Sequence, residues 1–177
     1  MSLTLRTTRE GVDWERVAAL LAHFGLSHDD AETQRLIFER SYAVVFAYDG
    51  DRLVGCGRAI SDGIRQAAIC NIALEEAYHG QQGGRAIIES LKAQLEGCTI
   101  TLYTHPQTIA LYEKLGFRRQ KTGMVIFCKE PEVEVWMEEV GFLLPRGHRF
   151  PDTESSYPGD RSEKGPSNSK EGIASSL

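Results

Sequence analysis

The chain has 177 residues, of which 41% are hydrophobic and 25% charged, and its formal net charge is -5. This length fits one domain, with room for an appendage, and the apolar content is enough for a core. The acidic balance argues against a nucleic-acid-binding surface, which is usually basic. No apolar run approaches the roughly 18 residues of a membrane span, and the N-terminal stretch lacks the apolar core of a secretory signal. We therefore expect a cytoplasmic, soluble protein.

The four cysteines show no CxxC spacing and lie within or beside apolar runs, which is typical of buried reduced thiols. The five histidines are scattered along the chain. A zinc site needs clustered ligands, so the sequence predicts no metal.

A strand over residues 2–8 and two helices are predicted at the start of the chain. Asp13 can cap the first helix, whose apolar residues recur at helical spacing until Gly25. Asp29 or Asp30 can cap the second helix. Its residues expected to be buried are Leu36, Ile37 and Phe38.

Strand and helix patterns then alternate as far as residue 128. Asp49-Gly50 is a turn signal inside a hairpin over residues 42–63, and a buried strand follows at 67–74. The later elements are predicted as a helix at 83–97, a strand at 99–104, a helix at 106–116 and a strand at 124–128. The order β-α-α-β-β-β-α-β-α-β predicts an α+β fold with a mixed sheet and helices on its faces.

The composition changes beyond residue 128, so residues 1–128 are predicted to form the domain. Residues 129–144 carry apolar residues at helical spacing and predict a short helix, although the alternation from Val133 to Met137 also permits a strand. Residues 145–177 are rich in Pro, Gly, Ser and charge. They have too little apolar surface to offset the entropy of ordering, and we expect a disordered or loosely packed tail.

A glycine-rich stretch, "YHGQQGGRAII" (Tyr78–Ile88), joins the strand at 67–74 to the following helix. The first turn of a helix has unpaired N–H groups and the positive end of the helix dipole, and small residues let a pyrophosphate approach them. A plain connection is the alternative for such a loop. The stretch lacks the Lys-Ser/Thr pair of a P-loop and the spacing of GxGxxG.

Two longer stretches carry a family resemblance. "NIALEEAYHGQQGGRAIIESL" followed by "YTHPQTIALYEKLGFRRQKTGMVIF" resembles the GCN5-related N-acetyltransferase (GNAT) superfamily, over about Leu3 to Cys128. "SDG" at Ser61–Gly63 and "KTGM" at Lys121–Met124 are similar to a group of small stand-alone acetyltransferases, some of which acetylate arylalkylamines such as serotonin. The resemblance implies the GNAT fold and acetyl-CoA as co-substrate.

The resemblance also implies a cofactor site. The family's Arg/Gln-x-x-Gly-x-Gly/Ala loop aligns without gaps so that Gln82 takes the place of the first glycine and Gly84 matches the second. A shift of one residue would let Gly83 serve as the first glycine. The strand before the loop is expected to align the cofactor, and His105 either contacts it or only begins a helix. The expected cofactor-binding residues are Ile72, Ala73, Leu74, His79, Gly80, Gln81, Gln82, Gly83, Gly84, Arg85 and His105.

Family analogy assigns Tyr112 as the acid that protonates the leaving thiolate, with a core tyrosine as the alternative. Asn71 takes a position where the resembling group often has Asp, and an amide is a poor base. Deprotonation of the amine would then fall to water, or to a more distant carboxylate such as Glu75 or Asp62, although both of these are expected to be solvated turn residues.

The expected function is acetyl transfer to a primary amine of a small molecule or peptide, by direct attack in a ternary complex. Gln82 and Asn71 motivate the alternative, an acetyl-CoA-binding module with weak or lost catalysis. No nucleic-acid or membrane partner is expected, and a monomer and a homodimer are both compatible with the sequence.

Overall fold

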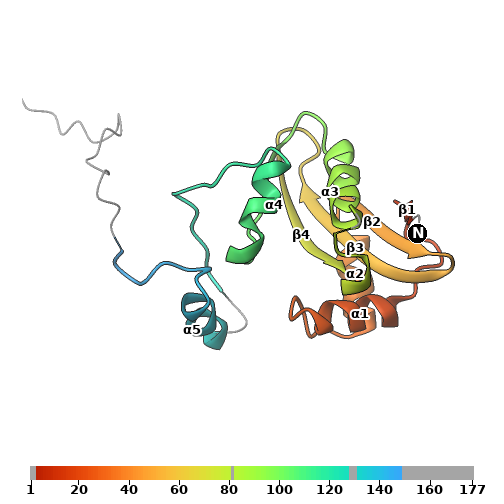
Figure 1. Cartoon of the computed structure of the whole chain (residues 1–177), viewed down its shortest axis with the longest axis horizontal. Helices are drawn as coiled ribbons and strands as arrows, with labels where there is room; N and C mark the ends of the chain where they lie inside the picture. Colours follow the sequence, from red (N-terminus) through yellow and green to blue (C-terminus); the bar gives the residue numbers. More distant parts are fainter. Residues whose placement is uncertain (1–2, 81, 128–130, 149–177) are drawn as a thin grey trace, which may run out of the picture. The chain divides into compact units, whose positions relative to one another are not determined.

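The computed structural model describes residues 3–80, 82–127 and 131–148 (Figure 1). The chain divides into two compact units, residues 1–126 and residues 127–177. The tail predicted from residue 145 lies largely outside the described residues, as does Cys128.

The larger unit is built on one five-stranded sheet whose strands lie side by side in chain order. β1 to β4 pair antiparallel, and β4 pairs parallel with β5. The strands are β1 (Thr4–Arg6), β2 (Ala43–Asp49), β3 (Arg52–Ser61), β4 (Gln66–Leu74) and β5 (Thr99–Thr101). The predicted α+β fold with a mixed, mostly antiparallel sheet is confirmed.

The helices of this unit are α1 (Trp14–His23), α2 (Ala31–Glu39), α3 (Gly83–Gln94) and α4 (Ile109–Lys114), with short 3₁₀ turns η1 (Glu76–Tyr78) and η2 (Pro106–Thr108). α1 and α2 begin with side-chain caps. Asp13 accepts from the Arg16 N–H at 3.0 Å, and Asp30 accepts from the Thr33 N–H at 2.8 Å. These bonds satisfy N–H groups that a helix start leaves unpaired, so the predicted cap at Asp13 is confirmed and Asp30 caps the second helix.

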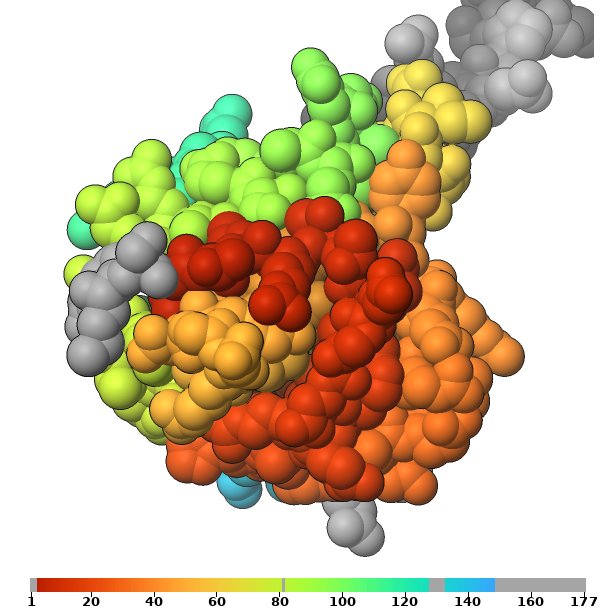
Figure 2. Space-filling view, turned by 90° about the vertical axis from the view of Figure 1, so that its right-hand side faces the viewer, coloured from red at the N-terminus to blue at the C-terminus, as the bar shows by residue number. Residues whose placement is uncertain are grey.

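Helices cover both faces of the sheet (Figure 1). β2 shows how, because alternate residues of a strand point to opposite faces. Val45 belongs to the cluster that contains Ile87 and Leu91 of α3, whereas Phe46 belongs to the cluster that contains Leu21 of α1 and Phe38 of α2. On the side shown in Figure 2, the N-terminal segment, drawn in red, lies beside the amber β2–β3 hairpin.

Three expectations for this unit need correction. Leu36 is 38% exposed because only one side of α2 faces the core, to which Phe38 contributes. The strand predicted over 99–104 ends at Thr101. The helix predicted over 106–116 begins as η2 and continues as α4 only to Lys114.

The strand predicted over 124–128 is wrong for its described residues. Residues 124–127 adopt no regular structure, and Met124 and Ile126 are 97% and 85% exposed. A strand needs a partner for its backbone groups. β5 has only three residues, and within the described residues no strand pairs with its other edge. An apolar run forms a strand only where a strand edge is available to it.

The smaller unit contains α5 (Pro131–Glu139). The backbone is therefore helical where alternation from Val133 to Met137 also permitted a strand. The Trp136 and Phe142 rings lie 5.8 Å apart, and Arg146 pairs with Glu134 at 2.5 Å.

Candidate functional site

β4 and β5 separate after a short stretch of pairing. Their pairing joins Gln66–Ala68 to Thr99–Thr101, but β4 continues to Leu74. Within the described residues, no strand pairs with this side of β4 beyond Ala68. Its backbone N–H and C=O groups can there bind an extended ligand that carries amides. Ile72, Ala73 and Leu74 lie on this part of β4, which pairs with β3 on one side but not with β5 on the other.

A β-bulge interrupts β4 within the same stretch. Cys56 pairs with Ala73 and Arg58 with Cys70, so two residues of β4, Asn71 and Ile72, lie opposite Gly57. Asn71 adopts φ 51°, a left-handed conformation that Asn tolerates better than most residues. The bulge bends β4 where it has left β5.

Gly57 allows the bulged strand to approach. A Cβ at this position would lie 2.6 Å from Ile72 Cδ1 and 2.9 Å from Ile87 Cγ2. Only a residue without a side chain fits there, because α3 and β4 already fill the space.

Arg58 holds the side chain of Asn71. The Arg58 Nε–H donates to Asn71 Oδ1 at 2.7 Å, and Arg58 Nη1 donates to the Ser41 hydroxyl at 3.4 Å. The bond fixes the amide with its oxygen toward the guanidinium. The orientation of the Asn71 amide is therefore fixed by Arg58. The amide itself cannot act as a base. Sequence reasoning missed Arg58, because nothing in a single sequence says which residue of β3 lies beside position 71.

The glycine-rich loop begins at η1 and ends at α3. His79 Nε2 donates to the Leu74 carbonyl at 2.8 Å, and its ring stacks on Phe24 with centroids 6.2 Å apart. His79 thus ties the loop back to the end of β4. Gly80 has φ 76°, which a glycine adopts without strain. Gln81 lies outside the described residues.

Gln82 is the residue before α3, and it has φ 64° and ψ 3°. This left-handed conformation is the one that favours glycine and costs another residue about 1 kcal/mol. The alignment without gaps therefore fits the backbone: Gln82 lies where a glycine is suited.

Gly83 and Gly84 have different surroundings. A Cβ on Gly83 would lie 2.8 Å from Leu74 Cδ2 and 3.0 Å from Leu3 Cδ1, so a larger residue here would make the ends of these leucine side chains shift. A Cβ on Gly84 would meet nothing within 4 Å. The first turn of α3 is thus packed against the domain at Gly83 and open at Gly84.

Among the described residues, the residue before α3 also makes no side-chain capping bond. Gln82 makes no capping bond, in contrast to Asp13 and Asp30 at the starts of α1 and α2. The first backbone bond is from the Ala86 N–H to the Gln82 carbonyl at 2.9 Å. The N–H groups of Gly83, Gly84 and Arg85 precede it and are the ones a helix leaves for an anion.

We expect Gln82→Gly to raise the free energy of unfolding by about 1 kcal/mol, because glycine adopts this conformation without a Cβ clash. Urea denaturation measures the change. Gln82→Ala is the matched control, since it removes the amide but keeps a Cβ. If alanine stabilises the protein as much as glycine, backbone strain is not the cause.

Tyr112 lies on α4, half-buried, with its ring edge-on to Phe117 at 5.8 Å between centroids. Phe117 packs on the cluster that contains α3 and one face of the sheet. Burial raises the pKa of Tyr112, and a hydrogen bond with Thr104 only partly opposes this. The phenol is therefore protonated at neutral pH and can donate a proton. Its packing beside Phe117 also matches the alternative of a core tyrosine.

His105 begins η2, and its Nδ1 accepts from the Gln107 N–H at 3.2 Å. This bond makes it a cap at the helix entry, and its contact with the cofactor stays a prediction. Thr108, in the same turn, donates to the His105 carbonyl at 2.8 Å and pairs with Thr104 at 2.7 Å.

Neither alternative carboxylate is placed as a free base. Asp62 accepts from the N–H groups of Ile64, Arg65 and Gln66, and these bonds hold the pKa of Asp62 below its usual value. Glu75 binds Arg16 and also accepts two bonds from Arg52 Nη2, at 2.7 and 2.8 Å. Glu75 is an ion-paired residue at the end of β4, not the solvated turn residue that the sequence suggested.

Three cysteines are described, and none forms a disulfide: Cys56 is buried, and Cys70 and Cys98 are half-buried. Burial raises the pKa of the Cys56 thiol to about 12, so it is uncharged. Within residues 3–80, 82–127 and 131–148, no group of three or more His, Cys, Asp or Glu side chains could hold a metal ion. No helix in the described part of the chain has the length and apolar character to cross a membrane.

Comparison with known proteins gives concordant matches. Residues 40–119 match the model of the acetyltransferase (GNAT) domain. Serotonin N-acetyltransferase 2, chloroplastic, of Oryza sativa subsp. japonica is 31% identical in an alignment of 141 residues that covers 73% of this chain and 70% of the relative. GCN5-related N-acetyltransferase 1, chloroplastic, of Arabidopsis thaliana is 27% identical in an alignment of 125 residues that covers 68% of this chain and 64% of the relative.

A solved structure agrees with these matches. A Staphylococcus aureus protein described as a "Probable Acetyltransferase" is 28% identical, with a TM-score of 0.61 over 71% of this chain and all of that chain. The relatives' names place those proteins in chloroplasts, whereas the cytoplasmic location of this chain stays a prediction. The family model, the relatives and the fold agree, and the chain belongs to the GNAT family of acetyltransferases.

Proposed function

We propose that this protein transfers the acetyl group of acetyl-CoA to a primary amine of a small molecule or peptide, by direct attack within a ternary complex. The observation that carries the proposal is the opening beside β4, next to an uncapped helix start. β4 loses its partner after Ala68, and α3 begins at Gly83 without a side-chain cap. The edge of β4 beyond Ala68 can pair with the amide-bearing arm of the cofactor, and the start of α3 can bind its pyrophosphate.

The residues present fit acetyl-CoA at this site. The pyrophosphate would accept from the N–H groups of Gly84 and Arg85, where the space at Gly84 is open. The pantetheine arm would pair with the backbone of Ile72 to Leu74, and N–H groups there can polarise the thioester carbonyl. Acetyl-CoA supplies the activated acyl group and the thiolate leaving group.

Tyr112 is the proposed acid. The neutral amine nitrogen forms a bond to the acetyl carbon, the carbon–sulfur bond breaks, and the sulfur takes the phenolic proton. The nitrogen then loses its extra proton, which returns through solvent to the phenolate and restores the phenol. The raised pKa of Tyr112 keeps that proton on the phenol at neutral pH. Two features support the acid role of Tyr112: the phenol is protonated at neutral pH, and the residue lies in the "ALYEKLGF" motif.

The ammonium proton leaves to water in this proposal. Asn71 cannot accept it, Asp62 is bound by three backbone N–H groups, and Glu75 is paired with two arginines. The rate of acetyl transfer at low amine concentration should therefore rise with pH and level off when the pH passes the pKa of the free amine, because only the neutral amine attacks.

The test measures thiol release from acetyl-CoA with a panel of amines that includes serotonin and a lysine-containing peptide. Acetyl-CoA binding is measured separately by calorimetry. The expected result is binding together with amine-dependent thiol release. Serotonin is included because one relative is named as a serotonin N-acetyltransferase. Absence of acetyl-CoA binding would contradict the proposal.

The same measurements test the second candidate, an acetyl-CoA-binding module without useful catalysis. The left-handed Gln82 and the amide at Asn71 favour it, because one weakens the loop and the other removes a carboxylate. Binding without thiol release for every amine in the panel is the result expected of the module.

A further inference from the structure

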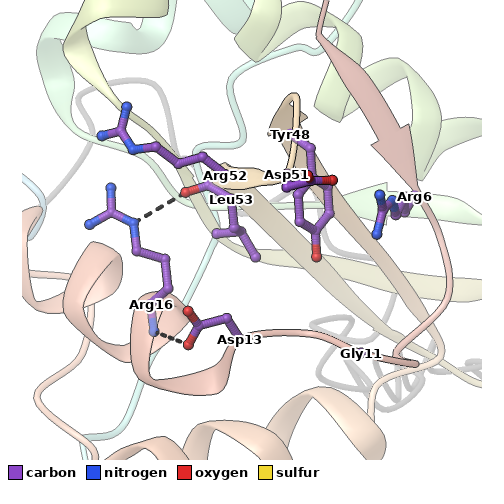
Figure 3. Close-up of a pocket in the computed structure, with 8 residues that line it drawn as sticks. All are labelled: Arg6, Gly11, Asp13, Arg16, Tyr48, Asp51, Arg52 and Leu53. Carbon is purple, nitrogen blue, oxygen red and sulfur yellow. Dashed lines mark hydrogen bonds between the residues drawn. The ribbon is translucent and has the colours of Figure 1, made fainter.

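A polar pocket is lined by residues outside the glycine-rich loop. It has a volume of about 490 Å³ and is formed by the end of β1, the segment before α1, the first turn of α1 and the β2–β3 turn (Figure 3). None of residues 79–85 lines it. The proposed acetyl transfer assigns no role to this pocket.

Tyr48 contributes a hydroxyl that has no partner. The residue is 4% exposed, and no atom in the described part of the chain makes a hydrogen bond with its hydroxyl. Figure 3 shows the hydroxyl pointing into the pocket. Burial raises the pKa of Tyr48, so the group is a protonated donor at neutral pH. A buried hydroxyl is nearly always hydrogen-bonded in a native protein, and this one requires an acceptor.

Arg6 supplies charge at the same place. Its Cζ lies 4.3 Å from the centroid of the Tyr48 ring, so the guanidinium stacks on the ring that carries the hydroxyl. Among the described residues, no carboxylate pairs with Arg6 and no carbonyl accepts from it. A planar guanidinium and a phenol are donors that a carboxylate matches well.

The other charged residues of the pocket restrict the charge of the anion that can bind there. Arg16 and Arg52 are already paired with Glu75. Asp13 and Asp51 also line the pocket, and one oxygen of Asp13 caps α1. Two carboxylates in the wall repel a multiply charged anion such as phosphate, but they attract an ammonium group.

We propose that this pocket binds a small zwitterion of the amino-acid class. The carboxylate of the ligand accepts from Arg6 and from the Tyr48 hydroxyl, and its ammonium group lies toward Asp13 and Asp51. The pocket volume leaves room for the ligand's side chain. The site is separate from the acetyl-CoA site and does not depend on the proposed function.

Ligand-observed NMR on the full chain tests the proposal with the twenty standard L-amino acids as probes. At least one is expected to bind. Its two truncated analogues, the amine without the carboxylate and the acid without the ammonium, are each expected to bind at least tenfold more weakly. No binding by any amino acid at tens of millimolar, or binding of the acid analogue or of inorganic phosphate as tight as that of the amino acid, would overturn the assignment.

Two variants connect any binding to this pocket. Tyr48→Phe removes only the hydroxyl, and it is expected to raise the melting temperature of the free protein while weakening amino-acid binding at least tenfold. Arg6→Gln should weaken binding similarly. Tyr103→Phe is the matched control, because Tyr103 is 75% exposed and lies outside the pocket. Unchanged amino-acid binding in both variants, or a lower melting temperature for Tyr48→Phe, contradicts the proposal.

Discussion

Gly84→Asp is expected to leave the free protein folded and to abolish its stabilisation by acetyl-CoA. The new side chain meets no atom within 4 Å of its Cβ, so it fits. A carboxylate in the first turn of α3 interacts favourably with the helix dipole, by about 0.3–1 kcal/mol. The same carboxylate lies where the pyrophosphate would bind, and like charges repel.

The measurement is a thermal melt with and without acetyl-CoA. At a ligand concentration of about 100 times Kd, a ligand stabilises the folded state by about 2.7 kcal/mol. For a chain of this size that is a rise of about 5–10 °C in Tm. Gly84→Asn is the matched control, since it has the same shape without the charge and should keep most of the rise. If acetyl-CoA raises the Tm of Gly84→Asp as much as that of the wild type, the pyrophosphate does not bind at the start of α3.

Tyr112→Phe is expected to lower kcat by about 10²–10⁴-fold, the usual contribution of a positioned general acid. The ring is retained, so packing against Phe117 persists and acetyl-CoA affinity should change little. Steady-state rates and acetyl-CoA calorimetry, made on the same preparation, separate the two effects.

A merely structural role for Tyr112 would give a different result. If the ring matters only for packing, Tyr112→Phe should keep its turnover, whereas Tyr112→Ala should lose stability and turnover together. Equal turnover of the wild type and Tyr112→Phe would therefore exclude the acid role. Urea denaturation of both variants shows whether a loss of rate comes from unfolding.

Local patterns predicted much of the domain. Asp13 caps a helix as its sequence position suggested, because a cap depends only on the next few residues. The apolar run of β2 before the Asp49-Gly50 turn and the buried run of β4 indicated strands correctly, since short apolar runs beside turn signals are typical of buried strands. The order of elements up to α4 needed no knowledge of contacts between distant parts of the chain.

Other features depend on contacts between residues far apart in the sequence. The apolar run at residues 124–127 has the composition of a strand, but whether it forms one depends on an available sheet edge. Glu75 looked like a turn carboxylate, and only the fold brings Arg16 and Arg52 to it. Sequence distances of 59 and 23 residues separate these pairs.

The sequence by itself determined the family, the glycine-rich loop and the place of Tyr112 in its helix, because each depends on neighbouring residues. Only the tertiary structure decided that Gln82 is left-handed, that Arg58 holds Asn71, and that a buried Tyr48 hydroxyl points into a separate pocket. These features arise where strands, helices and the N-terminal segment meet, and the conformation of one residue there depends on side chains that the sequence does not place beside it.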